Sequence, residues 1–414
     1  MPAEDHSLSL LPPDVGTEAR LLTALARSPA SVEKRRVAEL LEREVDWRAL
    51  ILQSAEHHVL PFIYYNLKGG FADSVPDAVR RQLRALYLYL YQPSIQIRGE
   101  LPRLLKYLED CGIEALTFKG PSLAALAYSE SHLRTFTDLD LLVAVEDVEP
   151  AVEALKQAGF REKNPIPDSY AATWDKYRPW HHQHGNANGY VREVSTRSID
   201  ELHVDLHWGL ASRYFQFPLD PEPLRSRSEP VELEDGALVR TFSPADTLLV
   251  QCMHAAKDGY HQLGHICDIA ELLRTHPGLD LEGVLQRARA VRSERMVQLG
   301  LLLSHELAGV SLPEPVRKSV RTDATEALAQ QVVRGLFTKR HGIGLLLHRC
   351  RFHVQVRDRW TDGLGAVYNA FRTSLRPTEK DRDWMELPPA LEILYPVVRL
   401  ARSLWESAAD RSGK

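Results

Sequence analysis

The sequence has few cysteines, and none of them are close together in the chain. The 414-residue chain contains Cys111, Cys252, Cys267 and Cys350, with no CxxC spacing. Such scattered cysteines fit a reduced, cytosolic compartment better than a disulfide framework. The first twenty residues are acidic and contain prolines where an export signal needs a basic start and an apolar run. The protein is therefore predicted to be cytoplasmic.

The sequence also lacks an excess of positive charge and any long apolar run. Lys and Arg together number 51 against 56 Asp and Glu, which gives a formal charge of −5. Broad, sequence-independent nucleic-acid binding depends on clustered positive charge, so this class is disfavoured, although a local basic patch stays open. No stretch approaches the ~20 apolar residues that a membrane span requires, so no span is expected.

Hydrophobic periodicity predicts helices toward both ends of the chain. The length of the chain suggests two or three structural units. From about residue 17 to 111, apolar residues recur three and four apart with charges between them. Pro61 interrupts one of these helical stretches, Pro102 predicts a kink or a break in another, and Gly112 is a typical helix stop. The helical pattern returns at about residue 245 and continues to the end.

Strands and helices alternate in the middle of the chain. Residues 113–118 read as a short strand, 121–128 as a helix with proline in its first turn, 137–145 as a strand, and 146–160 as an amphipathic helix with a glycine stop. This order predicts an α/β unit.

A long irregular segment separates this unit from the next strand. Residues 161–200 are rich in His, Asn, Gly and Pro, and are predicted to form a long functional loop with room for one short strand. Residues 199–210 read as the next strand.

Asp138 and Asp140 lie two residues apart in the predicted strand. Side chains alternate along a strand, so both carboxylates emerge on one face while Leu139 and Leu141 point the other way. Two carboxylates held this close repel each other when ionised, and a bound divalent cation is the usual remedy. Oxygen ligands suit Mg²⁺ or Mn²⁺, which commonly bridge to substrate phosphates.

The strand at 199–210 repeats this geometry, with His203, Asp205 and His207 on one face. If the two strands are neighbours, Asp205 joins the pair as a third ligand, and three carboxylates can hold two metal ions. Catalysis would then be mainly positioning and charge neutralisation. His207 could orient a carboxylate or contact substrate, but a structural role is the preferred interpretation for both histidines.

Lys119 and Gly120 follow the strand at 113–118, where the chain turns into a helix. A glycine here lets backbone N–H groups approach phosphate, and the helix N-terminus favours negative charge. Lys119 could bind phosphate or simply end the strand in solvent. Arg134 could face phosphate or pair with Asp138 or Glu130.

These spaced motifs resemble the uncharacterised nucleotidyltransferase family, within the polymerase-β-like nucleotidyltransferase superfamily. The resemblance spans roughly residues 47 to 275. Its matching positions are Lys119-Gly120, Tyr128, Leu133-Arg134, the run from Asp138 to Val143, and the run from Asp205 to Trp208.

The resemblance implies that Asp138, Asp140 and Asp205 are the catalytic, metal-binding carboxylates. It also implies that Gly120 lies at a nucleotide-phosphate turn, with Lys119 or Arg134 facing the triphosphate. The wider superfamily usually has Gly-Ser closer to its first Asp, whereas here Pro121 follows Gly120. Ser122 could take the place of that serine only if the turn is reshaped.

The expected fold is α+β and mostly helical. A small nucleotidyltransferase-like mixed β-sheet core at residues 112–243 would be flanked by an N-terminal helical region (1–111) and a C-terminal one (244–414).

The resemblance further implies an enzyme that uses Mg²⁺ (or Mn²⁺) and a nucleoside triphosphate such as ATP. It would transfer a nucleoside monophosphate to an unidentified acceptor hydroxyl and release pyrophosphate. A small molecule, peptide or protein acceptor is favoured over a large RNA. Two alternatives stay open. One is a catalytically inactive nucleotide-sensing or partner-binding protein that retains the fold, and the other is a hydrolase that uses the same metals on a phosphodiester.

Three polar segments have weaker signals. The histidines at 181, 182 and 184 could bind zinc, although a loop that closes over nucleotide or acceptor is preferred. His254 and Lys257 share one helix face, and with Asp268 they could contact nucleotide or form a polar helix surface. The basic segment 339–360 could touch RNA, an acidic peptide or a membrane surface, or be a solvated cationic face.

Overall fold

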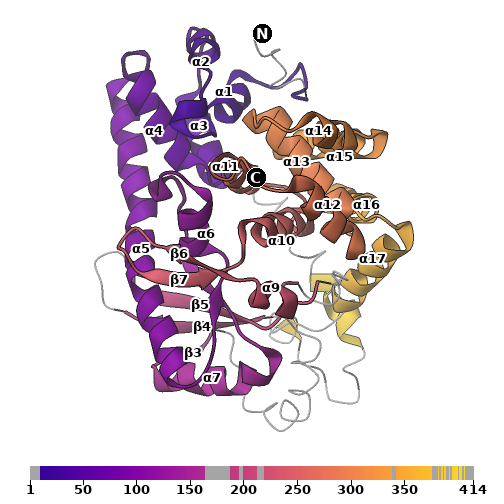
Figure 1. Cartoon of the computed structure of the whole chain (residues 1–414). Helices are drawn as coiled ribbons and strands as arrows, with labels where there is room; N and C mark the ends of the chain where they lie inside the picture. Colours follow the sequence, from indigo (N-terminus) through magenta and orange to yellow (C-terminus); the bar gives the residue numbers. More distant parts are fainter. Residues whose placement is uncertain are drawn as a thin grey trace.

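The structure is a computed structural model that combines many helices with a five-stranded mixed β-sheet and a small two-stranded sheet (Figure 1). The predicted α+β, mostly helical class is confirmed. The structure describes residues 10–163, 187–194, 199–211, 219–337 and 342–374, with a few positions after residue 380. Within these residues, no helix combines the length and apolarity needed to cross a membrane. All four cysteines are free.

The N-terminal part is helical, as predicted. Pro61 stands in the first turn of a new helix, and the chain reverses just before it at His58, whose φ is +57°. The interruption expected at Pro61 is therefore confirmed. The helices are α1 (Thr17–Leu25), α2 (Lys34–Leu41), α3 (Trp47–Glu56), α4 (Leu60–Gly70) and α5 (Asp77–Asp110).

Helix α5 continues through Pro102, so the break that this proline predicted does not occur. A proline inside a helix costs one backbone hydrogen bond. Leu101 and Leu104, on either side of Pro102, are buried in the core beneath the sheet, and this packing holds the helix together. The helix ends at Asp110, and the predicted stop Gly112 follows with φ +79°, while the N–H of Ile113 donates to the carbonyl of Leu108.

The central sheet has the order β1-β2-β5-β4-β3. The central pair, β2 and β5, is parallel, and the other pairs are antiparallel. The strands are β1 (Leu116–Thr117), β2 (Asp138–Leu142), β3 (Arg161–Glu162), β4 (Ala187–Glu193) and β5 (Glu201–His207).

The segment at 161–200 contains two strands where the sequence predicted a long loop with room for one. β3 and β4 both belong to the sheet, and β4 pairs with β5 along its whole length. Asn and Gly are poor strand formers, so the composition of β4 pointed to a loop. Burial of Tyr190 and Val191 in the sheet outweighs that local preference.

The two faces of the sheet have different coverings. Helices α5 and α7 (Val148–Gln157) pack on the face that carries Leu139, Leu141 and Val204. The opposite face carries Leu142, which packs with Val250 of α10 (Pro244–Lys257) and with Phe242. Helix α6 (Gly120–Ala127) connects β1 to the segment before β2. The polar side chains of β2 and β5 therefore face toward the α10 side of the sheet.

The return to helices at about residue 245 is confirmed. A small helix and hairpin, which the sequence analysis did not predict, precede it: α9 (Glu222–Ser226), β6 (Glu229–Glu232) and β7 (Leu238–Thr241). After α10 come α11 (Leu263–Thr275), α12 (Leu281–Ala290), α13 (Glu294–Ala308), α14 (Glu314–Val320), α15 (Asp323–Phe337), α16 (Gly342–Gln355) and α17 (Trp360–Ser374).

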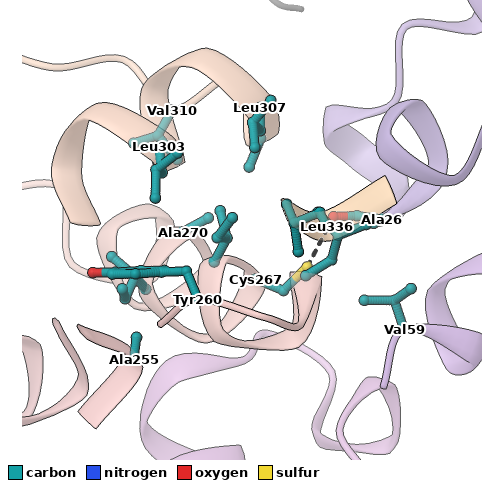
Figure 2. Packing of buried hydrophobic residues seen from close by; sticks show 14 of the residues in the cluster. Ala26, Val59, Ala255, Tyr260, Cys267, Ala270, Leu303, Leu307, Val310 and Leu336 are labelled. Carbon is teal, nitrogen blue, oxygen red and sulfur yellow. Dashed lines mark hydrogen bonds between the residues drawn. The ribbon is translucent and has the colours of Figure 1, made fainter. Parts of the chain in front are cut away.

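The N-terminal and C-terminal helices share one hydrophobic core. Figure 2 shows part of it, where Cys267 of α11 lies beside Ala26 from the N-terminal part. The Cys267 thiol donates a hydrogen bond to the Ala26 carbonyl at 3.1 Å. The two helical regions that flank the sheet in sequence are thus packed together in space.

Candidate metal and nucleotide site

The parallel pairing of β2 with β5 brings the predicted acidic residues together. Asp140 lies directly opposite Asp205, and Asp138 lies opposite His203. Since alternate residues of a strand share a face, Asp138, Asp140 and Asp205 emerge on one side of the sheet. The two strands are neighbours, which was the condition for Asp205 to join the aspartate pair.

Asp140, Asp205 and His207 form a compact group of potential metal ligands. One ligand atom from each lies within 4.8 Å of the others. Nε2 of His207 is 2.9 Å from Oδ1 of Asp140, a contact across the two strands that the sequence analysis did not specify. Two carboxylates and an imidazole are ligand types that bind divalent cations.

Asp138 is outside this compact group, but its carboxylate interacts electrostatically with Asp140, Asp205 and Lys119. Its side chain is half-buried. Burial raises the pKa of Asp138, and repulsion from Asp140 and Asp205 raises it further, while Lys119 acts in the opposite direction. The three carboxylates are thus close enough to disfavour one another's ionised forms, which is the condition that a divalent cation relieves.

Asp140 is the most enclosed of the three, with 5% of its surface exposed. Burial alone would raise its pKa, but the Lys119 ammonium and the hydrogen bond from His207 lower it. The Lys119 Nζ lies 3.3 Å from Asp140 Oδ1. Asp140 is therefore held as a charged carboxylate inside the protein, with its charge balanced by a neighbouring cation.

Helix α6 begins at Gly120, directly after Lys119, which confirms the predicted strand-to-helix turn. The φ of Gly120 is +52°, and a Cβ at this position would lie 3.2 Å from the backbone oxygen of Asp138. A glycine here lets the start of α6 approach β2 closely. The turn therefore places the N-terminus of α6 beside the carboxylates, where a helix end favours negative charge.

Ser122 is fully buried in the same turn. Its hydroxyl donates to the Lys119 carbonyl at 2.9 Å and lies 3.3 Å from the Thr117 hydroxyl. In this arrangement Ser122 stabilises the turn that carries Lys119. Its contact with nucleotide stays a prediction.

Arg134 pairs with Asp268 of α11, and not with Asp138 or Glu130, the two partners that its position in the sequence suggested. Its Nε donates to Asp268 Oδ1 at 2.8 Å, and its Nη1 donates to the Gly120 carbonyl at 3.2 Å. The Tyr128 hydroxyl donates to the same carboxylate oxygen at 2.7 Å. Arg134 therefore links the sheet to the large helical core. A contact between Arg134 and a triphosphate stays a prediction.

The end of α10 lies beside the carboxylates. Nδ1 of His254 is 3.1 Å from Oδ2 of Asp258, and Nζ of Lys257 is 3.7 Å from the other oxygen of that carboxylate. Burial lowers the pKa of both His254 and Lys257, and the nearby charge of Lys119 contributes to each shift. Val250, one turn before His254 on α10, belongs to the hydrophobic cluster that contains Leu142 of β2, so the end of α10 lies on the side of the sheet that bears the carboxylates.

Gly189 and Lys163, which lie beside Asp205, were not identified from the sequence. Gly189 of β4 lies opposite Asp205, and a Cβ at this position would be 3.2 Å from Asp205 Oδ1 and 3.4 Å from Cδ of Lys163. A glycine inside a strand is a signal for close approach. That signal was available, but it could not be used because β4 itself was not predicted.

Replacing Gly189 by alanine is expected to weaken Mn²⁺ binding. The added methyl group would press on the Asp205 carboxylate, and we expect a loss of roughly tenfold, since crowding a packed position costs about 1–3 kcal/mol. Isothermal titration calorimetry measures this affinity. Gly99→Ala is the matched control, because no atom lies within 4 Å of its added methyl. Equal Mn²⁺ affinity in the two variants would contradict this role of Gly189.

The other candidate residues are placed as follows. The His203 ring lies 3.7 Å from Glu201. The histidines at 181, 182 and 184 fall outside the described residues. Part of the basic segment 339–360 forms α16, and Phe352 of this helix is buried in the large helical core.

The fold and this geometry can be compared with known proteins. Among curated proteins, none matches the sequence. A model of the uncharacterised nucleotidyltransferase family matches residues 43–309, which is more than half of the chain and includes every candidate residue from Lys119 to Asp268. The chain therefore belongs to the uncharacterised nucleotidyltransferase family.

Proposed function

We propose that the protein transfers a nucleoside monophosphate from a nucleoside triphosphate to an acceptor hydroxyl and releases pyrophosphate. The observation that carries this proposal is the meeting of Asp140, Asp205 and His207 across two parallel strands, in a chain of a nucleotidyltransferase family. Asp138 on the same face completes the three carboxylates that such a transfer uses.

The residues at the site fit a divalent cation. The neighbourhood holds five carboxylates (Asp138, Asp140, Asp205, Asp258 and Asp268) and three cationic side chains (Lys119, Arg134 and Lys257), so negative charge is in excess. Asp138, Asp140 and Asp205 would hold Mg²⁺ or Mn²⁺, and His207 lies within ligand range or orients Asp140 by its hydrogen bond. When bound, the cation neutralises phosphate charge and stabilises the leaving pyrophosphate.

The protein groups around the carboxylates bind and orient the substrates. The positive end of α6 and the Lys119 ammonium favour phosphate oxygens at the Gly120 turn. Asp205 is more exposed than Asp140 and lies opposite Gly189 of β4. We propose that Asp205 accepts the proton of the acceptor hydroxyl as a general base.

The acceptor we propose is a small molecule, a peptide or a protein. The formal charge of −5 disfavours a large RNA, whose binding depends on clustered positive charge. ATP is the first nucleotide to test. The cytoplasmic location predicted from the scattered cysteines is part of the same proposal.

The test is incubation with each labelled nucleoside triphosphate, Mg²⁺ and a panel of hydroxyl acceptors from sugars to folded proteins. We expect wild-type protein to release pyrophosphate and label an acceptor, and the variant with Asp138→Ala plus Asp140→Ala to do neither. The control variant carries Glu109→Ala plus Asp110→Ala, two exposed carboxylates at the far end of α5.

Two other outcomes would replace this proposal. Nucleotide binding without pyrophosphate release with any acceptor would favour the inactive, nucleotide-sensing alternative. Metal-dependent cleavage of a phosphodiester, without use of the triphosphate, would favour the hydrolase.

A further inference from the structure

The ammonium group of Lys119 contacts Asp140, one of the proposed metal ligands. Lys119 Nζ lies 3.3 Å from Asp140 Oδ1, and the lysine side chain is 18% exposed. Like charges in a partly buried site repel strongly. A divalent cation that binds Asp140 must therefore compete with the Lys119 ammonium for the same carboxylate.

A second ammonium group lies in the same electrostatic neighbourhood. Burial lowers the pKa of Lys257, at the end of α10, and the charge of Lys119 lowers it further, whereas Asp258 and Asp140 act in the opposite direction. The Lys257 ammonium lies 3.7 Å from Asp258, whose other oxygen lies 3.1 Å from His254. Val250, two helical turns before Lys257 on the same face of α10, belongs to the hydrophobic cluster that contains Phe118 and Leu142 of β2. Helix α10 therefore carries Lys257 on the side of the sheet that bears Asp140 and Lys119.

We propose, resting on the metal-dependent function above, that Lys119 and Lys257 form a polyphosphate-binding site and that Lys119 exchanges Asp140 for phosphate when a divalent cation binds. Before the cation binds, Lys119 balances part of the charge on the carboxylates. Once Asp140 holds the cation, Lys119 loses its carboxylate partner and needs another source of negative charge, whereas Lys257 keeps Asp258. Phosphate oxygens supply that charge through short, charge-assisted hydrogen bonds.

The exchange predicts opposite effects of one substitution on two ligands. Without nucleotide, Lys119→Met should bind Mn²⁺ about tenfold more tightly than wild type, because the competing ammonium is gone. With Mn²⁺ at saturation, Lys119→Met should bind inorganic tripolyphosphate about tenfold more weakly, because a charged hydrogen bond is lost. A lysine with a merely structural role would not tighten one ligand while weakening the other.

Lys257→Met isolates the contribution of α10. It should change Mn²⁺ affinity less than Lys119→Met does, since Asp258 lies 3.7 Å from Lys257 and balances its charge in the free protein. It should weaken tripolyphosphate binding about tenfold. Lys318→Met is the matched control, because this lysine is exposed on α14 and pairs with Glu314. Calorimetric titration of each variant, with circular dichroism to verify the fold, gives both affinities.

The results separate this inference from the proposed function. Should wild type bind Mn²⁺ and tripolyphosphate while Lys257→Met binds tripolyphosphate equally well, α10 is not part of the phosphate site. Unchanged or weaker Mn²⁺ binding by Lys119→Met overturns the exchange. A wild-type protein that binds no Mn²⁺ overturns the metal centre itself, and the exchange with it.

Discussion

Replacing Asp140 by asparagine is expected to lower the rate of pyrophosphate release by a factor on the order of 10² to 10³, the range found when one group that stabilises a transition state is removed. The substitution keeps the size of the side chain and its capacity to bond with His207. It removes the charge that Lys119 balances and that a divalent cation requires. The loss should therefore appear in kcat and in Mn²⁺ affinity, with the fold retained.

The measurement is steady-state pyrophosphate release, with Mn²⁺ affinity determined on the same preparations. Asp73→Asn is the matched control, because it makes the same chemical change at an exposed position. An Asp140→Asn protein that turns over at the wild-type rate would remove the carboxylate cluster from the mechanism.

Arg134→Met is expected to lower the free energy of unfolding by about 3–5 kcal/mol, the cost of removing one partner of a buried ion pair. Burial alone would lower the pKa of Arg134, but Asp268 raises it above its ordinary value. Without the guanidinium, the Asp268 carboxylate keeps only the Tyr128 hydroxyl among these partners, and the Gly120 carbonyl loses a donor. The sheet and the helical core should then be less firmly connected.

Urea unfolding of Arg134→Met, Asp268→Leu and the double variant measures this link. Because the two residues are in contact, their effects should not add, and the coupling energy should reach about 1–3 kcal/mol. The exposed pair of Lys106 with Asp110 is the control, and Lys106→Met should leave stability nearly unchanged. Additive effects at Arg134 and Asp268 would contradict the proposed link.

The local geometry of the carboxylates could be predicted from the sequence because strand periodicity depends on spacing alone. The two-residue intervals in Asp138-Leu139-Asp140 and His203-Val204-Asp205 place the acids on one face and Leu139 and Val204 in the core, and the structure has this arrangement. The same spacing put His207 on the polar face. Its hydrogen bond to Asp140 depends on how the two strands pair, which spacing does not specify.

Features that depend on long-range pairing escaped the sequence analysis. Arg134 pairs with Asp268 on α11, a helix of the large helical core. No local sequence pattern indicates that partner. Strand β4 has a composition typical of loops, and it forms because β5 provides an edge and the core buries Tyr190. The role of Gly189 depends on that pairing and was missed with it. Pro102 predicted a kink or a break in the helix. Helix α5 continues through it because Leu101 and Leu104 are buried in the core.

A crystal grown with Mn²⁺ and a non-hydrolysable triphosphate tests the central claim most directly, because anomalous scattering locates Mn²⁺ independently of the protein atoms. We predict an anomalous peak between Asp140 and Asp205, at roughly 2.1 Å from carboxylate oxygens. We also predict phosphate density at the Gly120 turn. A peak elsewhere, or nucleotide bound with no metal at these carboxylates, would contradict the account.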